Sequence, residues 1–163
     1  MFSEEDMALI IRQMTPSDKP AVMALLRDTP EFEPAEVPVA EEVLDCYLAS
    51  PGEGYRTLVA DDGGEVIGYI CFGSTPLTAA AWDIYWMAVA RPRRGQGAGY
   101  RLLRQAEKDI KQAGGRLILI ETSSKPNYLP TRRFYRRQGY RQVSRIRDFY
   151  APGDHRITFE KRL

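Results

Sequence analysis

The sequence predicts an α/β fold, of the α+β kind, in which helices cover a single mixed sheet. Strand-like segments alternate along the chain with segments whose apolar residues recur at helical spacing, and this order is typical of helices packed on a sheet. The 163 residues contain no repeat, low-complexity stretch or linker, so we expect a single domain over 1–163. Apolar residues make up 44% and charged residues 28% of the chain, which is the composition of a folded protein.

The first half of the chain is expected to hold a strand, two helices and a β-hairpin. Thr15 before Pro16 suits the N-cap and the first turn of a helix, which Thr29-Pro30 ends. The prolines that follow indicate a loop, and Asp-Asp-Gly-Gly indicates the hairpin turn. The strand is predicted at 9–13 and the two helices at 15–28 and 39–49. The hairpin consists of a strand at 56–60, a turn at 61–64 and a second strand at 66–72.

The second half adds a strand, a long amphipathic helix, a buried strand, a short helix and a closing pair of strands. Leu102, Ala106 and Ile110 fall on one apolar stripe, and Gly114-Gly115 ends that helix. The near-continuous apolar run that follows is typical of a strand buried on both faces. In chain order these elements are predicted at 80–90, 97–113, 116–121, 130–139, 140–146 and 156–161.

Charge is distributed unevenly along the chain, although the net charge is only +1. The segment 28–55 holds eight acidic residues and no Lys or Arg, a charge of −8. The segment 91–163 holds 19 Lys and Arg against six acidic residues, a charge of +13. The basic part predicts an anionic partner, and the acidic segment predicts a cationic partner or a solvated surface.

Neither a metal site nor a membrane segment is predicted. Cys46 and Cys71 stand apart, without a Cys-x-x-Cys pair or a companion histidine cluster, which argues against a zinc site and a disulfide framework. No apolar run approaches the roughly 20 residues that cross a bilayer. The acidic start of the chain also differs from the basic start of a secretory signal, so we expect a cytoplasmic protein.

The segment 89–100, V-A-R-P-R-R-G-Q-G-A-G-Y, has the chemistry of a phosphate-binding loop. It leads from a strand into a helix, and its glycines can turn successive N–H groups toward an anion beside the positive end of the helix dipole. Arg91, Arg93 and Arg94 add positive charge. A Walker loop is excluded because GK followed by Ser or Thr is absent, and a Rossmann loop because Tyr100 stands in place of the third glycine.

The remaining pattern, Arg94-x-x-Gly97-x-Gly99 after a strand that ends in Met87-Ala88-Val89, resembles the acyl-CoA signature of the GNAT superfamily of N-acyltransferases. The order of elements resembles that family over nearly the whole chain. The resemblance implies a mostly antiparallel sheet of six to seven strands, two of them parallel and splayed apart, flanked by about four helices, with acetyl-CoA as cosubstrate. It implies that the strand holds the pantetheine arm and the loop the pyrophosphate, through Met87, Ala88, Val89, Arg94, Gly95, Gln96, Gly97, Ala98, Gly99 and Tyr100.

A second GNAT-like motif lies in 129–140, where Phe134-Tyr135 is followed by three residues and Gly-aromatic. By this resemblance Tyr135 lies near the cofactor sulfur and can protonate the leaving thiolate; the alternative is a packing tyrosine. A phenol pKa near 10 exceeds a thiol pKa of about 8.5, so Tyr135 would contribute hydrogen bonding as much as full proton transfer. Asn127 is a candidate contact of the pantetheine arm.

Two carboxylates compete for the role of the base that accepts the proton of the acceptor amine. Asp83 precedes Val89 by six residues on the same strand, where several GNAT enzymes carry a Glu or His, and Glu121 ends the next strand. Either could instead be a hydrogen-bonded residue at a strand end. Strict alternation predicts one face with Asp83, Tyr85 and Met87 and the other with Trp82, Ile84 and Trp86.

The predicted function is transfer of an acetyl group from acetyl-CoA to the primary amine of a small molecule. In the GNAT fold, the loop and helix after the first helix form one wall of the acceptor entrance. Here that wall would carry, with no basic residue to neutralise them, Glu31, Glu33, Glu36, Glu41 and Glu42 around Phe32. Such a wall predicts a cationic acceptor; the alternative is a solvated helix face that balances the basic half.

The same features are compatible with two other functions. A protein or peptide N-acetyltransferase and a non-catalytic acyl-CoA sensor stay open as alternatives. Nucleic-acid binding is not expected, because the arginines are scattered over a loop, two helices and a strand without an array of stacking aromatics. The expected partner is a small-molecule amine, no membrane contact is expected, and the oligomeric state stays open, a homodimer included.

Overall fold

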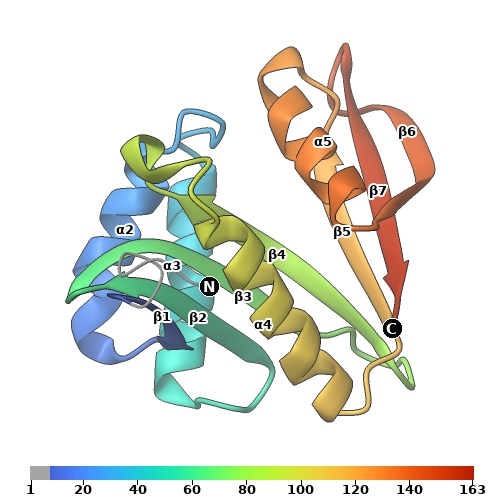
Figure 1. Cartoon of the computed structure of the whole chain (residues 1–163). Coiled ribbons are helices and arrows are strands. Elements are labelled where there is room, and N and C mark those ends of the chain that lie inside the picture. The colour runs from blue at the N-terminus through green and yellow to red at the C-terminus, as the bar shows by residue number, and fades with distance from the viewer. Residues whose placement is uncertain (1–7) are drawn as a thin grey trace.

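The computed structural model describes residues 8–163 and arranges them around a seven-stranded sheet (Figure 1). The strand order is β1-β2-β3-β4-β5-β7-β6, in which β4 and β5 are parallel and all other neighbours are antiparallel. The strands are β1 (Leu9–Gln13), β2 (Tyr55–Asp62), β3 (Glu65–Ser74), β4 (Ala81–Val89), β5 (Leu117–Ser123), β6 (Arg141–Ala151) and β7 (Asp154–Arg162). The α-helices are α2 (Lys19–Asp28), α3 (Glu36–Ala49), α4 (Ala98–Gln112) and α5 (Leu129–Arg137), and the 3-10 helices are η1 (Pro16–Asp18), η2 (Arg91–Arg93) and η3 (Pro126–Tyr128). This arrangement confirms the predicted fold class.

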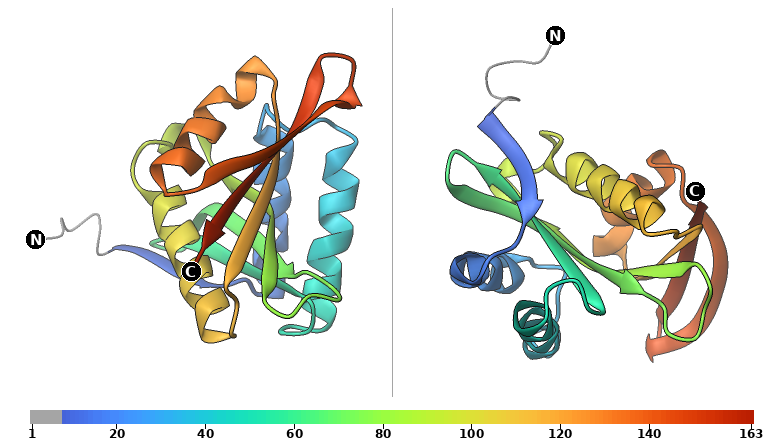
Figure 2. Two further views of the ribbon diagram at one scale, coloured as in Figure 1. Left: turned by 90° about the vertical axis from the view of Figure 1, so that its right-hand side faces the viewer. Right: turned by 90° about the horizontal axis from the view of Figure 1, so that it is seen from below.

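The helices cover both faces of the sheet (Figure 2). On one face, Val22 of α2 and Leu44 of α3 pack in the same buried cluster as Tyr69 of β3. On the other face, Leu102 of α4 packs in the same buried cluster as Ile70 of β3. Because successive residues of a strand point to opposite faces, β3 serves both clusters and reads as a continuous apolar run.

The parallel pair β4 and β5 is joined over only part of its length. Ala81–Ile84 pairs with Leu117–Ile120, and beyond these residues the two strands diverge, as Figure 1 shows. The ends of both strands, 85–89 and 121–123, are therefore not paired with each other. This confirms the predicted splayed pair and leaves a strand edge of β4 without a neighbour at the opening.

A β-bulge in β4 overturns the predicted alternation of its side chains. Cys71 of β3 pairs with Trp86 while Phe72 pairs with Ile84, so Tyr85 is an extra residue on β4. A bulge residue shifts the register of faces by one. Met87 therefore packs in the same cluster as Ile84, and Trp86 packs in the opposite cluster, so the predicted placement of Met87 with Asp83, and of Trp86 with Ile84, is wrong.

Two boundaries differ from the prediction for identifiable reasons. Helix α3 begins at Glu36, three residues earlier than expected, because Pro38 lies in the first turn, where its missing N–H has no helical acceptor. The turn between β2 and β3 is confined to Gly63 and Gly64, whose φ angles of 62° and 98° are both positive. The two preceding aspartates extend β2 instead of forming the turn.

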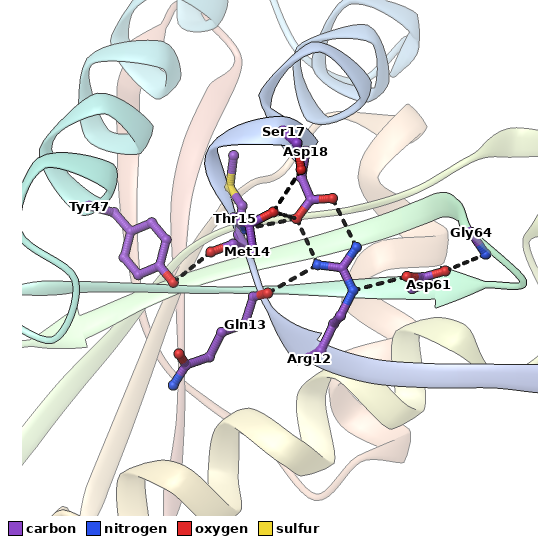
Figure 3. Close-up of polar contacts among 9 residues, drawn as sticks. All are labelled: Arg12, Gln13, Met14, Thr15, Ser17, Asp18, Tyr47, Asp61 and Gly64. Atoms are coloured by element: carbon purple, nitrogen blue, oxygen red, sulfur yellow. Dashed lines mark hydrogen bonds and ion pairs between the residues drawn. The ribbon is translucent and has the colours of Figure 1, made fainter.

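Hydrogen bonds centred on Arg12 fix the start of α2 to the sheet (Figure 3). Arg12 Nη1 and Nη2 donate to Asp18 Oδ2 and Oδ1 at 2.7 and 2.9 Å, and its Nε donates to Asp61 Oδ2 at 2.9 Å. The bonds from Arg12 lower the pKa of Asp18 to about 2. Nearby, the Tyr47 hydroxyl of α3 donates to the Met14 carbonyl at 3.0 Å. These contacts anchor α2 and α3, and with them the loop that joins the two helices.

Residues 8–163 contain neither a membrane-spanning helix nor a cluster of metal-ligating side chains. None of the helices in this range is long and apolar enough to span a membrane. The same residues contain no group of three or more His, Cys, Asp or Glu that could hold a metal ion.

Candidate active site

A cavity of about 690 Å³ lies where β4 and β5 separate. Its walls come from the ends of these strands, the loop before α4, helix α5 and the β6–β7 hairpin. A further wall comes from residues 29–35, which form the acidic loop between α2 and α3, and from Glu36 at the start of α3. Most of the residues predicted for the site line this cavity: Tyr135, Glu121, Met87, Ala88, Val89, Arg94, Gly95, Gly97, Ala98, Gly99 and Tyr100. Three predicted residues do not line it: Asp83, Gln96 and Asn127.

The first turn of α4 and the glycines before it present backbone donors to the cavity. Gly95 and Gly97 have φ angles of 76° and 91°, conformations that glycine adopts without strain. The N–H of Arg101 donates to the Gly97 carbonyl at 3.0 Å and starts the helical ladder, so the N–H groups from Ala98 to Tyr100 have no helical acceptor. Together with the positive end of the helix dipole, these donors suit a pyrophosphate group.

Two arginine side chains of this loop, Arg93 and Arg94, form ion pairs with carboxylates. Arg94 Nη1 and Nη2 donate to Glu31 Oε1 and Oε2 at 2.9 and 3.2 Å, which makes a bidentate ion pair. Arg93 forms an ion pair with Asp62, and its Nε donates to Gln96 Oε1 at 3.3 Å. The Gln96 side chain is therefore held by Arg93 outside the cavity wall, although the sequence pattern placed it in the cofactor loop.

Tyr135 is both a packing residue and a cavity residue. Its ring centroid lies 5.6 Å from that of Phe134, 5.9 Å from Tyr140 and 6.0 Å from Phe159. The side chain is only 5% exposed and still lines the cavity. Burial raises the pKa of the Tyr135 phenol above its ordinary value, so the hydroxyl is a hydrogen-bond donor at neutral pH.

Of the two candidate bases, Glu121 lines the cavity and Asp83 does not. The Glu121 side chain is half exposed, with its Oε1 atom 3.6 Å from Nη1 of Arg156. Asp83 accepts a hydrogen bond of 2.5 Å from the Thr75 hydroxyl, which corresponds to the alternative of a hydrogen-bonded strand residue. The fold thus brings Glu121 and Tyr135 to one cavity and leaves Asp83 outside its lining.

The acidic loop forms one wall of the cavity, and α3 contributes fewer glutamates to that wall than predicted. The lining residues of this segment with charged or aromatic side chains are Glu31, Phe32, Glu33 and Glu36. Glu41 and Glu42 lie further along α3 and do not reach the cavity. Glu36 Oε2 accepts the backbone N–H of Glu33 at 2.7 Å, and burial raises the pKa of Glu36.

The expectation that no basic residue neutralises these glutamates is wrong. Three of the five predicted glutamates have an ion-pair partner: Glu31 with Arg94, Glu33 with Lys125, and Glu41 with Lys19. Arg94 and Lys125 lie 63 and 92 residues from their partners in the sequence. Only the folded chain brings them together, so local composition could not reveal the pairing.

The cavity also holds residues that sequence reasoning missed. Asp154 is 7% exposed and accepts a hydrogen bond of 2.5 Å from the Ser123 hydroxyl. Tyr85, Tyr128 and Tyr150 add aromatic surface to the lining. No spacing rule joins these residues, because the approach of Ser123 to Asp154 depends on the register of β5 with β7. The adjacent aromatic residues Phe149 and Tyr150 and the Thr-Ser end of β5 are the available sequence signals, and neither indicates a site alone.

Comparison with known sequences relates the chain to acetyltransferases, in agreement with a cavity that suits acetyl-CoA. A model of the Acetyltransferase (GNAT) family matches residues 20–140. The chain is 32% identical over 135 residues to the aminoalkylphosphonate N-acetyltransferase of Salmonella typhimurium, a match that covers 81% of this chain and 84% of that protein.

Solved structures of acetyltransferases have the same fold as this chain. A protein of Desulfovibrio desulfuricans, described as an acetyltransferase of the GNAT family, is 36% identical, with a TM-score of 0.91 over 95% of this chain and 99% of its own. A Salmonella typhimurium structure with its cofactor acetyl-CoA shares the fold, with 18% identity and a TM-score of 0.78 over 96% of this chain and 94% of its own. The chain belongs to the GNAT family of acetyltransferases and is an acyltransferase that uses acetyl-CoA as its cosubstrate.

Proposed function

We propose that the protein transfers the acetyl group of acetyl-CoA to the primary amine of a small, cationic molecule. The observation that carries this proposal is the acceptor end of the cavity, which is bounded by the acidic loop and the β6–β7 hairpin. The cavity of about 690 Å³ has to hold the reacting end of the cofactor as well as the acceptor, which favours a small amine over a protein or peptide, whose chain would need an open groove on either side of the reacting amine.

The charges at the acceptor end favour a cation. Glu36, Glu121 and Asp154 line the cavity, and Lys125 is already bonded to Glu33 at 2.9 Å and lies 3.7 Å from Asp154. Aromatic faces beside carboxylates attract organic cations. The Salmonella relative is named for acceptors that carry a phosphonate, but at the acceptor end of this chain Lys125 is paired with Glu33 and lies near Asp154, and Arg156 lies 3.6 Å from Glu121.

The residues of the cavity divide the chemistry among them. Acetyl-CoA, when bound, supplies the thioester whose carbonyl carbon the amine attacks, so that a C–N bond forms and the C–S bond breaks. The N–H groups from Ala98 to Tyr100 hold the pyrophosphate. Glu121 accepts the proton that the attacking ammonium must lose, directly or through a water molecule. Tyr135 donates a hydrogen bond to the sulfur as negative charge develops on it.

We expect Glu121→Gln to lower kcat/KM about tenfold at neutral pH, because the amide cannot accept the amine proton. The loss should shrink at alkaline pH, where free amine is already abundant. Asp83→Asn is the matched control, since it changes a carboxylate of the neighbouring strand that does not line the cavity. Steady-state rates across pH decide between them: if Asp83→Asn lowers the rate and Glu121→Gln does not, the base has been assigned to the wrong residue.

An acceptor screen tests the substrate class. We expect spermidine and related polyamines to be acetylated with higher kcat/KM than 2-aminoethylphosphonate or acidic amino acids, measured as free thiol released from acetyl-CoA. Changing both Glu33 and Glu36 to Gln should raise KM for spermidine about fivefold at low ionic strength, and added salt should reduce the difference. The same double change at Glu41 and Glu42, outside the cavity, should leave KM unaltered. A screen in which anionic amines react faster would refute the cationic class.

A further inference from the structure

The acidic loop contacts both sides of the opening between β4 and β5. Toward the phosphate loop, the Glu31 carboxylate accepts two bonds from Arg94. Toward β5 and η3, the Tyr128 hydroxyl donates to the Glu31 carbonyl at 2.7 Å, and Lys125 Nζ donates to Glu33 Oε1 at 2.9 Å. Residues far apart in the chain therefore meet at one short segment, and Glu31 is bonded to both sides.

The pair of Glu31 and Arg94 has the geometry of a fixed contact. Two parallel bonds define the plane and direction of the guanidinium, and Arg94 Nε also donates to the Val89 carbonyl at 3.2 Å. The Glu31 side chain is only 14% exposed, so the pair is partly shielded from water. Burial raises the pKa of Glu31, but the bonds and charge of Arg94, together with the backbone N–H of Glu31 itself and the charge of Arg91, lower that pKa on balance, so the carboxylate is charged at neutral pH.

Arg94 also lies where an anion is expected. It immediately precedes Gly95 in the loop whose N–H groups suit the pyrophosphate, and it lines the cavity. A guanidinium has five N–H donors, and the bonds to Val89 and Glu31 use three of them, which leaves two for a phosphate oxygen. One side chain can thus bind the cofactor and the acceptor wall together.

We propose that Glu31 is a positioning residue that holds Arg94 for the pyrophosphate and thereby couples cofactor binding to the order of the acceptor wall. The inference rests on the proposed function only in taking the acidic loop as the acceptor wall. A shared side chain gives the two ligands a coupling free energy, so each binds more tightly when the other is present. The enzyme then assembles its acceptor wall when the cosubstrate is in place.

Hydrogen exchange with coenzyme A as the only ligand tests this without an acceptor. In the natural protein, saturating coenzyme A should slow amide exchange both in 94–100 and in the acidic loop, by about threefold or more. In Glu31→Gln the slowing should be confined to 94–100, and the dissociation constant of coenzyme A should rise about three- to tenfold as Arg94 loses its partner. Glu41→Gln, which removes a carboxylate outside the cavity, should behave as the natural protein does.

The outcomes separate this inference from the proposed function. Protection of the acidic loop that persists in Glu31→Gln, or that is absent from the natural protein, would overturn the coupling through Glu31. Tighter binding of coenzyme A to Glu31→Gln would also overturn it, because Glu31 would then compete for Arg94 rather than position it. Failure to acetylate any small amine would refute the proposed function and leave this measurement unaffected.

Discussion

Gly97→Asp is expected to abolish binding of acetyl-CoA while the protein still folds. The glycine has a φ of 91° directly before α4, and a Cβ atom built there meets no atom within 4 Å, so the substitution costs backbone strain without a clash. The new carboxylate would face the pyrophosphate beside the unpaired N–H groups of the first turn. A ligand at 100 times its dissociation constant stabilises a folded protein by about 2.7 kcal/mol, and this gain should vanish in the variant.

Thermal melting with and without acetyl-CoA gives the measurement. Gly97→Ala is the matched control, because it brings the same unfavourable φ without a negative charge and should retain most of the rise in Tm. A full rise in Tm for Gly97→Asp would show that the pyrophosphate binds elsewhere.

Tyr135→Phe should lower kcat about 100-fold with little change in the affinity for acetyl-CoA, because the ring stays packed and only the hydroxyl is lost. Burial raises the pKa of Tyr135, and a phenol is already a weaker acid than a thiol. Complete proton transfer to the leaving sulfur is therefore uphill, and we expect the hydroxyl to act mainly as a hydrogen-bond donor. Since the phenol stays protonated, its ionisation should not limit the rate as pH rises through the range of ordinary assays.

Tyr140→Phe provides the control for this prediction. Tyr140 belongs to the same aromatic cluster, but its hydroxyl donates to the buried carboxylate of Glu107 at 3.1 Å and does not line the cavity. Removing that hydroxyl should lower the free energy of unfolding by about 1–3 kcal/mol and leave kcat nearly unchanged. Equal losses of kcat in the two variants would indicate that Tyr135 acts through packing alone.

Local patterns predicted the parts of the molecule that are encoded in consecutive residues. The glycines before α4 impose positive φ angles, and the apolar stripe of α4 follows its helical period, so both could be read from short stretches of sequence. The Phe-Tyr motif was found for the same reason. These features also fixed the order of strands and helices, since each element carries its own signal.

Features that depend on distant pairing could not be predicted in this way. The bulge at Tyr85 is defined by the pairing of β3 with β4. It places Met87 and Trp86 on the faces of the sheet opposite to those that strict alternation predicts. The bonds of Glu31 to Arg94 join residues 63 positions apart, so a stretch that reads as uniformly acidic becomes partly neutralised. The sequence could not separate the two candidate bases for a similar reason, since Glu121 and not Asp83 lines the cavity only once the strands have assembled.

The short parallel ladder has a consequence for how the protein unfolds. Four residue pairs, Ala81–Ile84 with Leu117–Ile120, hold β1 to β4 against β5, β7 and β6, and the cavity opens directly beyond them. The two halves of the sheet thus share few backbone hydrogen bonds, although one buried cluster, which includes Ile84, Leu102 and Phe159, spans both of them. A cosubstrate lying across the cavity contacts both halves, so it adds contacts at the place where the sheet has fewest. Partial opening at the splayed ends would remove the active site while the strand pairing within each half persists, and bound cosubstrate should raise the free energy of that opening.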